Sequence, residues 1–340
     1  MFANFGSGIR LRTGSNPFFS IFKSPQNPPP VIINLSQNLT LAMATLSAPD
    51  NRRPTCPSCS RPTSFCLCTR LKTPVLENSI AVTVLQHSLE KKHPLNSAKI
   101  ATLGLKNVDV ICVSDVLSEA HFDLHLFESN PEIGSHDSVE NRKKIVPLQP
   151  ADISFTIEKK GVVTSLVNNW NQIQDFDQLL VDQSAIDGVR NGFTVKKMQR
   201  GRDHKYVEEF VIDVPPGSLL LFPSECSIGV EDVNFKVKNL IVLDGTWSKA
   251  TKMYKENPWL KLLPHLKLDI DKLSLYGEVR RQPKAECLSS IESIVYALKA
   301  IGGEDLEGLD CLLDVFVSMV VDQRRCKDER LKFESNIKSM

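Results

Sequence analysis

Residues 239–254, NLIVLDGTWSKATKMY, contain the strongest structural signal in this chain. Their opening run LIVL has no polar alternation, which is typical of a strand buried on both faces of an at least partly parallel sheet. Asp244 and Gly245 then predict a turn, and Thr246 or Ser248 can act as the N-cap of a following helix. A carboxylate is therefore expected at the carboxyl end of a central strand, where open α/β sheets bind ligands. Because Asp-Gly is also a common turn pair, a purely structural role for Asp244 is the alternative.

Three further apolar runs predict strands of the same α/β core, with helices flanking the sheet. They are residues 80–85 (IAVTVL), residues 108–113 (VDVICV) and residues 217–225 (GSLLLFPSE), and the first two are expected to be buried. In the last run Pro223 ends the strand, and Ser224 and Glu225 follow it. Since the carboxyl ends of parallel strands share an edge, Ser224, Glu225 and Asp244 are expected at one rim of the sheet.

The length of 340 residues suggests about two domains, or one large domain with additions. Apolar residues make up 41% of the chain, which is enough for a sizeable core. No run approaches the ~18 apolar residues of a membrane helix, so no membrane association is expected. The formal net charge is only +1, so binding to nucleic acid would have to come from a local basic patch.

Residues 1–49 have the composition of a targeting segment. They contain no Asp or Glu, carry Arg10, Arg12 and Lys23, and are rich in Ser, Asn and Pro. This composition favours a transit peptide for a plastid or mitochondrion, with a plain disordered tail as the alternative. A translation start at Met43 would give a shorter chain for the cytoplasm or nucleus, so one gene could supply both locations.

A cysteine-rich segment within residues 50–75 predicts a small metal-binding module. Cys56 and Cys59 form a Cys-x-x-Cys pair, and Cys66 and Cys68 follow closely enough for four thiolates to bind one tetrahedral zinc ion. Four protein ligands close the coordination sphere, so such a site would be structural rather than catalytic. Disulfides are the competing interpretation, but the other five cysteines are scattered and odd in number, which fits a reducing compartment.

Residues 137–205 look polar and irregular, and we interpret them as an insertion in a core domain that spans residues 76–340. They end in a basic cluster, which is a candidate RNA-docking surface because dense positive charge attracts phosphates. A solvated loop is the competing interpretation. The cluster contains Arg190, Lys196, Lys197, Arg200, Arg202, His204 and Lys205.

The carboxyl-terminal third predicts three helices. The helix after the DGTW turn carries Lys249 and ends before Pro258, which cannot continue it. Ser289 and Glu292 have the spacing of a capping box, so a second helix begins there and ends at the glycine pair 302–303. A last amphipathic helix is expected at about residues 306–321.

The letters DGTW at residues 244–247 also resemble the Asp-x-Thr-Trp signature of the DTW-domain family. Other blocks of that family occur in the expected order over roughly residues 52–112 and 215–300, which makes the resemblance more specific than one motif. A mild departure is Ser290, where the family has Thr. The other blocks are the Cys-x-x-Cys and Cys-x-Cys segment, Gln86-His87 with Glu90 and Leu95-Asn96-Ser97, Pro223-Ser224-Glu225, Arg280-Arg281-Gln282-Pro283, and Leu288-Ser289-Ser290 with Glu292.

This resemblance implies a tRNA-uridine aminocarboxypropyltransferase. Such an enzyme transfers the 3-amino-3-carboxypropyl group of S-adenosylmethionine to N3 of a uridine in tRNA and releases methylthioadenosine. The resemblance also implies a SPOUT-like α/β fold, related to the knotted methyltransferases, with the cofactor among loops at the carboxyl ends of the last core strands. The expected partners are therefore tRNA and S-adenosylmethionine, beside the structural zinc.

The same resemblance implies roles for residues at the strand ends. Asp244 is the candidate base for the N3 proton, with Glu225 as the alternative, and Thr246 and Trp247 complete the catalytic loop. The expected cofactor contacts are Phe222, Pro223, Ser224, Gly245, Arg281, Gln282 and Leu288. The expected RNA contacts are His87, Lys91, Lys249 and Arg280. A histidine after a strand is often only a structural hydrogen-bonding residue, so that interpretation of His87 stays open.

Several alternatives stay open from the sequence alone. An RNA methyltransferase of the same broad fold would transfer the methyl group, and product mass distinguishes it. A non-catalytic, zinc-containing RNA-binding protein would bind tRNA but not the cofactor. Within the transferase interpretation, Asp244 can instead hold the loop or the amino group of the cofactor. Arg281 suits either the cofactor carboxylate or an RNA phosphate.

Overall fold

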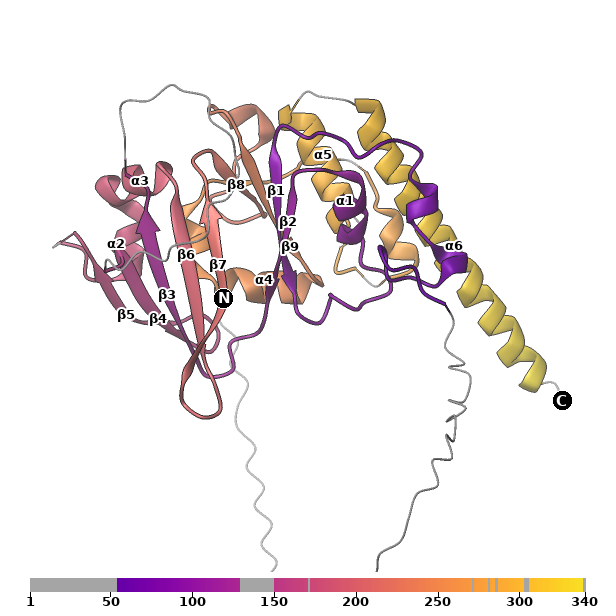
Figure 1. Cartoon of the computed structure of the whole chain (residues 1–340), viewed down its shortest axis with the longest axis horizontal. Helices are drawn as coiled ribbons and strands as arrows, with labels where there is room; N and C mark the ends of the chain where they lie inside the picture. Colours follow the sequence, from indigo (N-terminus) through magenta and orange to yellow (C-terminus); the bar gives the residue numbers. More distant parts are fainter. Residues whose placement is uncertain are drawn as a thin grey trace, which may run out of the picture. The chain divides into compact units, whose positions relative to one another are not determined.

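The computed structural model describes residues 54–128, 150–170, 172–270, 272–280, 282–284, 287–302 and 306–338. The segment interpreted as a transit peptide, the alternative start at Met43, and Arg281 lie outside the described residues. The described part of the chain contains one parallel and one antiparallel β-sheet, together with helices that pack against them (Figure 1). The chain is therefore a mixed α/β protein.

The first sheet is parallel and carries the DGTW turn at its centre. Its strands are β1 Ala81–His87, β2 Val108–Val113, β8 Ser218–Leu221, β9 Asn239–Asp244 and β10 His265–Leu266, in the order β10-β8-β9-β1-β2. β9 lies between β8 and β1, and all six of its residues are buried. This confirms the prediction of a central strand from the LIVL run.

Strand β2 occurs where the sequence predicts it, but the expectation that it is buried is wrong. It forms one edge of the sheet, and Asp109, Val110 and Cys112 are exposed. A short run rich in β-branched residues has the same appearance on an edge as in the centre, because such residues suit any pleated surface that is at least half buried.

A second, antiparallel sheet replaces the irregular structure expected for residues 137–205. Its strands are β3 Glu119–Leu126, β4 Ile153–Glu158, β5 Val163–Asn168, β6 Phe193–Arg200 and β7 Tyr206–Val214, in the order β5-β4-β3-β6-β7, and helices α2 Phe176–Val181 and α3 Gln183–Arg190 lie between β5 and β6 in the sequence. In β4, Ile153, Phe155 and Ile157 are buried and alternate with less buried residues. This alternation places apolar residues on one face only, so no continuous apolar run marks the strand. Residues 137–149 of the expected insertion lie outside the described residues.

Two apolar cores cover opposite faces of the parallel sheet. Leu240 and Val242 of β9 belong to one core, and Ile241 and Leu243 belong to the other. The first core also contains residues of α1 Ala98–Gly104, α5 Ser290–Gly302 and α6 Leu306–Lys338, and the second contains residues of α4 Trp247–Lys255, η4 Pro258–Leu262 and the antiparallel sheet. The short 3₁₀ helices η1 Thr63–Phe65, η2 Cys68–Arg70, η3 Val230–Asp232 and η5 Leu275–Glu278 complete the elements. The parallel sheet is thus a middle layer with α4 on one side and α1 and α5 on the other (Figure 1).

The helix signals in the carboxyl-terminal third are largely confirmed. Thr246 is the N-cap of α4, since its Oγ1 accepts from Lys249 N at 3.4 Å. Ser289 and Glu292 form a reciprocal capping box at the start of α5, with Glu292 Oε2 accepting from Ser289 N at 2.7 Å. The expected end of the last helix near residue 321 is wrong, because α6 continues to Lys338.

The continuation of α6 is polar, and charged side chains spaced three or four residues apart support it. Arg325 pairs with Asp322, and Arg330 pairs with Glu334. Across the described ranges, every helix is too short or too polar to cross a lipid bilayer.

Candidate functional site

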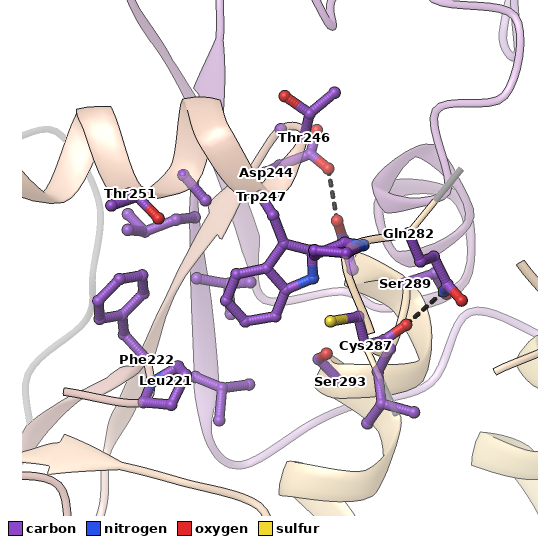
Figure 2. A pocket seen from close by; sticks show the side chains of 18 of the residues that line it. Leu221, Phe222, Asp244, Thr246, Trp247, Thr251, Gln282, Cys287, Ser289 and Ser293 are labelled. Atoms are coloured by element: carbon purple, nitrogen blue, oxygen red, sulfur yellow. Dashed lines mark hydrogen bonds between the residues drawn. The ribbon is translucent and has the colours of Figure 1, made fainter. Parts of the chain in front are cut away.

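A pocket of about 830 Å³ opens at the carboxyl ends of β8 and β9 (Figure 2). Its size is typical of a site for a small organic ligand. Three loops line it: the loop after β8, the DGTW turn after β9, and residues 276–290, which lead into α5. The position matches the sequence expectation that ligands bind at this edge of the sheet.

Asp244 lines the pocket and is only 4% exposed. Three side chains donate hydrogen bonds to its carboxylate: Ser290 Oγ at 2.6 Å, Gln86 Nε2 at 3.0 Å and Asn96 Nδ2 at 3.2 Å. These donors come from α5, from β1 and from the loop between β1 and α1. Asp244 therefore connects three elements that are far apart in the sequence.

Burial raises the pKa of Asp244, and the negative charge of Glu90 raises it further. The three hydrogen-bond donors act in the opposite direction, because they stabilise the ionised carboxylate. A carboxyl group with a raised pKa can take up and release a proton closer to neutral pH than an ordinary aspartate. Asp244 is therefore a buried carboxyl group with a raised pKa, and three hydrogen bonds hold it in place.

Trp247 is the exposed aromatic residue of the DGTW turn. It is 36% exposed, begins helix α4 and lines the pocket. Figure 2 shows its indole ring between the side chains of Leu221 and Phe222 on one side and those of Gln282 and Cys287 on the other. An accessible indole in this position offers a flat face on which a planar ring can stack.

The apolar side of the pocket begins at Phe222, whose ring stacks on Tyr254 at a centroid distance of 4.4 Å. Gln282 Nε2 donates to the carbonyl of Cys287, which holds two ends of the loop before α5 together. The pocket thus has one side rich in apolar side chains and one side with Asp244 and hydroxyl groups. Its apolar lining includes Leu221, Phe222, Pro223, Leu266, Leu268 and Leu288.

A cluster of charges borders the polar side. Arg280 lines the pocket, and its Nη2 donates to Glu90 Oε1 at 2.7 Å while its Nη1 donates to the Tyr276 hydroxyl at 3.1 Å. Lys249 Nζ lies 3.6 Å from the same Glu90 oxygen. The pKa of Glu90 is lowered, since Arg280, His93 and Lys249 outweigh the burial that by itself would raise it.

The structure brings together most of the residues expected at the site. Asp244, Gly245, Thr246 and Trp247 line the pocket, as do Phe222, Pro223, Arg280, Gln282 and Leu288. Arg280 was expected to contact RNA, and the structure puts it in the pocket wall.

Ser224 and Glu225 do not join Asp244 in the pocket lining. Leu221 is paired with Val242, so β8 ends two residues short of the level of Asp244. The chain then follows β10, with Phe222 N donating to Leu266 O at 3.0 Å. Ser224 Oγ lies 3.0 Å from His265 Nδ1, and Glu225 is exposed. Ser224 and Glu225 therefore follow the carboxyl end of β8, as expected, but lie outside the pocket lining.

His87, Lys91 and Lys249 also lie outside the pocket lining. His87 is 1% exposed and its Nε2 lies 3.1 Å from Asp115 Oδ1, so the open alternative of a structural histidine is the one that the structure supports. Lys91 is exposed in the loop between β1 and α1, and Lys249 is near the pocket through its contact with Glu90.

Sequence reasoning did not assign site roles to four residues that organise the pocket: Gln86, Glu90, Asn96 and Tyr276. In the sequence, Gln86, Glu90 and Asn96 stand out only as letters of a family block. The available signal was their position directly after a predicted buried strand, at the same sheet edge as Asp244. Tyr276 comes from a 3₁₀ helix with no periodic pattern, and its hydroxyl donates to Leu95 O.

Four of the seven residues in the basic cluster predicted as an RNA-docking surface pair with carboxylates of the protein. Lys196 pairs with Glu208 at 3.1 Å, Arg200 Nη1 lies 3.5 Å from Glu119, and Arg190 pairs with Asp187. Lys197 is fully buried and lies 3.0 Å from Glu209, so it cannot contact RNA. Lys196 and Lys197 differ in exposure because they are consecutive residues of β6, and consecutive side chains on a strand point to opposite faces of the sheet.

The four cysteines of residues 50–75 converge, as predicted. Their sulfur atoms all lie within 4.8 Å of one another, with Cys56 and Cys68 at 3.8 Å and Cys59 and Cys66 at 3.8 Å. All four are free thiols, which removes the disulfide alternative for this segment. A regular tetrahedron with Zn–S bonds of ~2.3 Å has S···S edges of about 3.8 Å, so the cluster has the dimensions of a zinc site.

Arg70 connects this module to the rest of the fold, and Arg61 adds a second, partly buried positive charge beside the cysteines. Arg70 Nη1 donates to Ser318 Oγ of α6 at 3.0 Å, and Arg70 also pairs with Asp322. Arg61 Nη1 is buried without a hydrogen-bond partner in the described residues, and Cys59 contributes to the electrostatic environment of Arg61. A dianionic Cys₄ metal centre would compensate this buried cation.

The chain is similar in sequence to several curated proteins. The curated protein tRNA-uridine aminocarboxypropyltransferase 2 of Drosophila melanogaster is 25% identical over 255 residues, which cover 74% of this chain and 68% of that protein. The protein of the same name from Mus musculus is 30% identical over 112 residues, 32% of this chain and 37% of that protein. tRNA-uridine aminocarboxypropyltransferase A of Arabidopsis thaliana is 29% identical over 77 residues, 23% of this chain and 29% of that protein.

No solved structure matches the chain. The model of the DTW domain matches residues 53–134 and 178–324, which include the cysteine module, the DGTW turn and the loops around the pocket. The unmatched residues 135–177 fall largely inside the stretch interpreted as an insertion. Since the match covers more than half of the chain, this protein belongs to the DTW domain family.

Proposed function

We propose that this protein is a tRNA-uridine aminocarboxypropyltransferase, which transfers the 3-amino-3-carboxypropyl group of S-adenosylmethionine to N3 of a uridine in tRNA. The observation that carries the proposal is the position of Asp244. The DGTW turn of a DTW domain places this carboxylate in the wall of a pocket large enough for a nucleoside ligand. The names of the curated relatives agree with this activity.

The residues of the pocket suit S-adenosylmethionine. The apolar side around Leu221 and Phe222 fits a purine ring, and the polar side with Arg280 fits an amino acid group. The bound cofactor supplies an electrophilic carbon attached to a positively charged sulfur, which is a good leaving group. The protein therefore has to align the two reactants and exclude water.

Asp244 has the environment of the base that takes the proton from uridine N3. The N3–carbon bond forms while the carbon–sulfur bond breaks, and its electron pair stays on the sulfur of methylthioadenosine. The raised pKa of Asp244 favours this proton transfer near neutral pH. Glu225, the alternative base, is exposed and does not line the pocket, which supports Asp244.

Trp247 offers an accessible stacking face at the pocket for the target uracil. Attack through N3 requires that this atom is not base-paired, so the target nucleotide has to be unpaired or flipped out of its stack. The exposure of Trp247 beside the buried Asp244 supports such an arrangement.

The parallel sheet and the position of its pocket support a SPOUT-like fold, related to the knotted methyltransferases. The sheet has five parallel strands, and the pocket lies at the carboxyl ends of β8 and β9. Cys56, Cys59, Cys66 and Cys68 would hold a structural zinc ion, which stabilises their loop by closing it with four thiolates.

The test is an assay of the released nucleoside. Purified protein is incubated with S-adenosylmethionine, with and without unmodified tRNA. The proposal predicts methylthioadenosine that forms only when tRNA is present. Release of S-adenosylhomocysteine would instead identify a methyltransferase. Binding of tRNA without either product would leave a non-catalytic RNA-binding protein.

A further inference from the structure

Glu90 is a buried carboxylate next to the pocket whose position the proposed chemistry does not yet explain. Its side chain is 3% exposed, and it lies in the loop between β1 and α1. Burying an ionised carboxylate costs free energy unless charged partners compensate it. Those partners are Arg280 at 2.7 Å and Lys249 at 3.6 Å, which come from the loop before α5 and from α4. Glu90 therefore holds two cations from distant parts of the chain.

Arg280 is fixed by more than its pairing with Glu90. Its Nη1 donates to the Tyr276 hydroxyl at 3.1 Å, and its guanidinium carbon lies 5.6 Å from the centre of the Tyr276 ring. Tyr276 is itself anchored, since its hydroxyl donates to Leu95 O in the loop that carries Glu90. A guanidinium group has five N–H donors, and its bonds to Glu90 and Tyr276 leave others for a ligand in the pocket that Arg280 lines.

The charge of this cluster suits an anion. One carboxylate, Glu90, is close to two cations, Arg280 and Lys249, so the three groups keep one positive charge. Burial raises the pKa of Asp244, so this carboxyl group stays protonated up to a higher pH than an ordinary aspartate. It therefore carries less negative charge to offset the positive charge of the cluster. The side chain of Arg280 is 19% exposed, and a cation in this position fits a small anion inside the pocket better than a phosphate on an RNA surface.

We propose that Arg280 binds the carboxylate of the aminocarboxypropyl group and that Glu90 is the positioning residue that directs Arg280 into the pocket. This inference rests on the proposed function and deepens it, since it assigns the part of the cofactor that is transferred to a particular side chain. It also separates this end of the pocket from the apolar side around Leu221 and Phe222, where the nucleoside would bind.

The test uses two ligands that differ in the group in question. S-adenosylmethionine carries the carboxylate, whereas methylthioadenosine lacks the whole aminocarboxypropyl group. Isothermal titration calorimetry measures both ligands with the wild-type chain and with the variants Arg280→Ala, Glu90→Ala and Glu90→Gln. We expect affinity for S-adenosylmethionine to fall roughly 10- to 100-fold in Arg280→Ala and Glu90→Ala, as for the removal of a charged hydrogen bond, and less in Glu90→Gln. Affinity for methylthioadenosine is expected to change less than about twofold.

A double-mutant cycle separates positioning from a general effect on folding. If Glu90 acts through Arg280, adding Glu90→Gln to Arg280→Ala causes no further decrease in affinity for S-adenosylmethionine. Glu256→Gln is the matched control, because Glu256 is also a buried carboxylate, 1% exposed and paired with Lys252, but does not line the pocket. It is expected to lower the melting temperature without changing the ratio of the two affinities.

Equal decreases for both ligands in the Arg280 and Glu90 variants would overturn the inference, because they would indicate a distorted pocket. Unchanged affinities would overturn it too, and a selective decrease in Lys284→Ala alone would move the carboxylate to Lys284, another cation in the lining. If the wild-type chain binds neither ligand and forms no methylthioadenosine with tRNA, the proposed function itself fails. The two failures are therefore distinguishable.

Discussion

The Ser290 hydroxyl lies 2.6 Å from Asp244 Oδ1, although the two residues are 46 positions apart in the sequence. This hydrogen bond joins the end of the central strand β9 to the first turn of α5. The position at which the family has Thr therefore carries Ser here and keeps the hydroxyl that faces Asp244. Gln86 and Asn96 hold the other carboxylate oxygen, so Asp244 is fixed from both sides.

Replacing Asp244 by Asn tests its role as the base. The amide keeps the size of the side chain but cannot accept the N3 proton, so we expect the transfer rate to fall by about 10²- to 10⁴-fold. The measurement is the initial rate of methylthioadenosine release with saturating tRNA. Ser290→Ala leaves the carboxylate in place and is expected to reduce the rate much less. A decrease in Ser290→Ala as large as that in Asp244→Asn would assign Asp244 a mainly structural role.

The pH dependence of the rate follows from the raised pKa of Asp244. A base has to be deprotonated, so kcat/KM should fall on the acid side with an apparent pKa above the usual range of an aspartate. Arg280→Lys keeps the positive charge in the pocket wall and is expected to lower the rate without moving this acid limb. An acid limb at the ordinary aspartate pKa would contradict the assignment.

The raised pKa of Asp244 also predicts how the stability of the protein changes with pH. A carboxylate in a salt bridge makes a protein more stable as pH rises, whereas Asp244 is expected to make it less stable. The folded state holds the Asp244 proton more tightly than the unfolded state, so the free energy of unfolding decreases as pH rises from the ordinary aspartate pKa through the raised one. Asp244→Asn removes this contribution. The stability of the variant relative to the wild type should therefore increase with pH in that window, as measured by urea unfolding at several pH values.

Removal of zinc is expected to lower the stability of the fold rather than to affect the reaction directly. We expect one zinc ion per chain by metal analysis, and a lower melting temperature after chelation, because the four thiolates hold a module that packs on α6 through Arg70. Cys59→Ser should have the same effect. Cys112→Ser is the control, since Cys112 is an exposed thiol on the edge strand β2. A melting temperature that stays the same after zinc is removed would contradict a structural metal.

The binding of tRNA should depend on Lys91 and Lys92 more than on the basic residues of β6. Both lysines are exposed in the loop that also carries Glu90 and lies beside the pocket. Changing both to Ala should weaken tRNA binding and reduce its salt dependence, by roughly 0.7 to 0.9 in log–log slope for each phosphate that is no longer neutralised. The measurement is fluorescence anisotropy at several salt concentrations.

Lys196→Ala with Arg200→Ala is the comparison for this experiment. Both side chains already pair with carboxylates of the protein, Glu208 and Glu119, so removing them should leave the salt dependence of tRNA binding unchanged. The reverse pattern, with binding abolished in the β6 variant only, would place the RNA on the antiparallel sheet.

Lys197 should be a stability residue. Its charge is buried between the rings of Phe122 and Phe210 and paired with Glu209, and burial lowers its pKa. Lys197→Ala leaves Glu209 without this partner, so we expect the free energy of unfolding to fall by about 3–5 kcal/mol, with unchanged tRNA affinity for the folded protein. A decrease below about 1 kcal/mol would show that Glu209 is compensated by other donors.

The sequence predicts the parallel half of the fold better than the antiparallel half. A buried central strand is a continuous apolar run, and the LIVL run before Asp244 is unambiguous in that respect. The antiparallel strands bury only alternate residues, such as Phe122 and Leu124 of β3, and polar residues in between hide the pattern. The polar continuation of α6 beyond residue 321 was missed for a related reason, since it is stabilised by charge pairs rather than by an apolar stripe.

Local sequence motifs predicted site residues only where a strand is followed directly by a turn and a helix. Asp244, Thr246 and Trp247 follow directly from the strand–turn–helix pattern. Whether Ser224 and Glu225 line the pocket could not be predicted, because the sequence does not reveal that the chain follows β10 after Phe222. Contacts between distant segments, such as that of Glu90 with Arg280, depend on the tertiary fold and carry no local signal.

The central claim is tested most directly by the mass of the modified nucleoside. The purified chain is incubated with unmodified tRNA and S-adenosylmethionine, and the tRNA is digested and analysed by mass spectrometry. The account predicts a uridine that carries an added 3-amino-3-carboxypropyl group with the wild-type chain and none with Asp244→Ala. A methylated nucleoside, or an aminocarboxypropyl product that forms equally with Asp244→Ala, would contradict it.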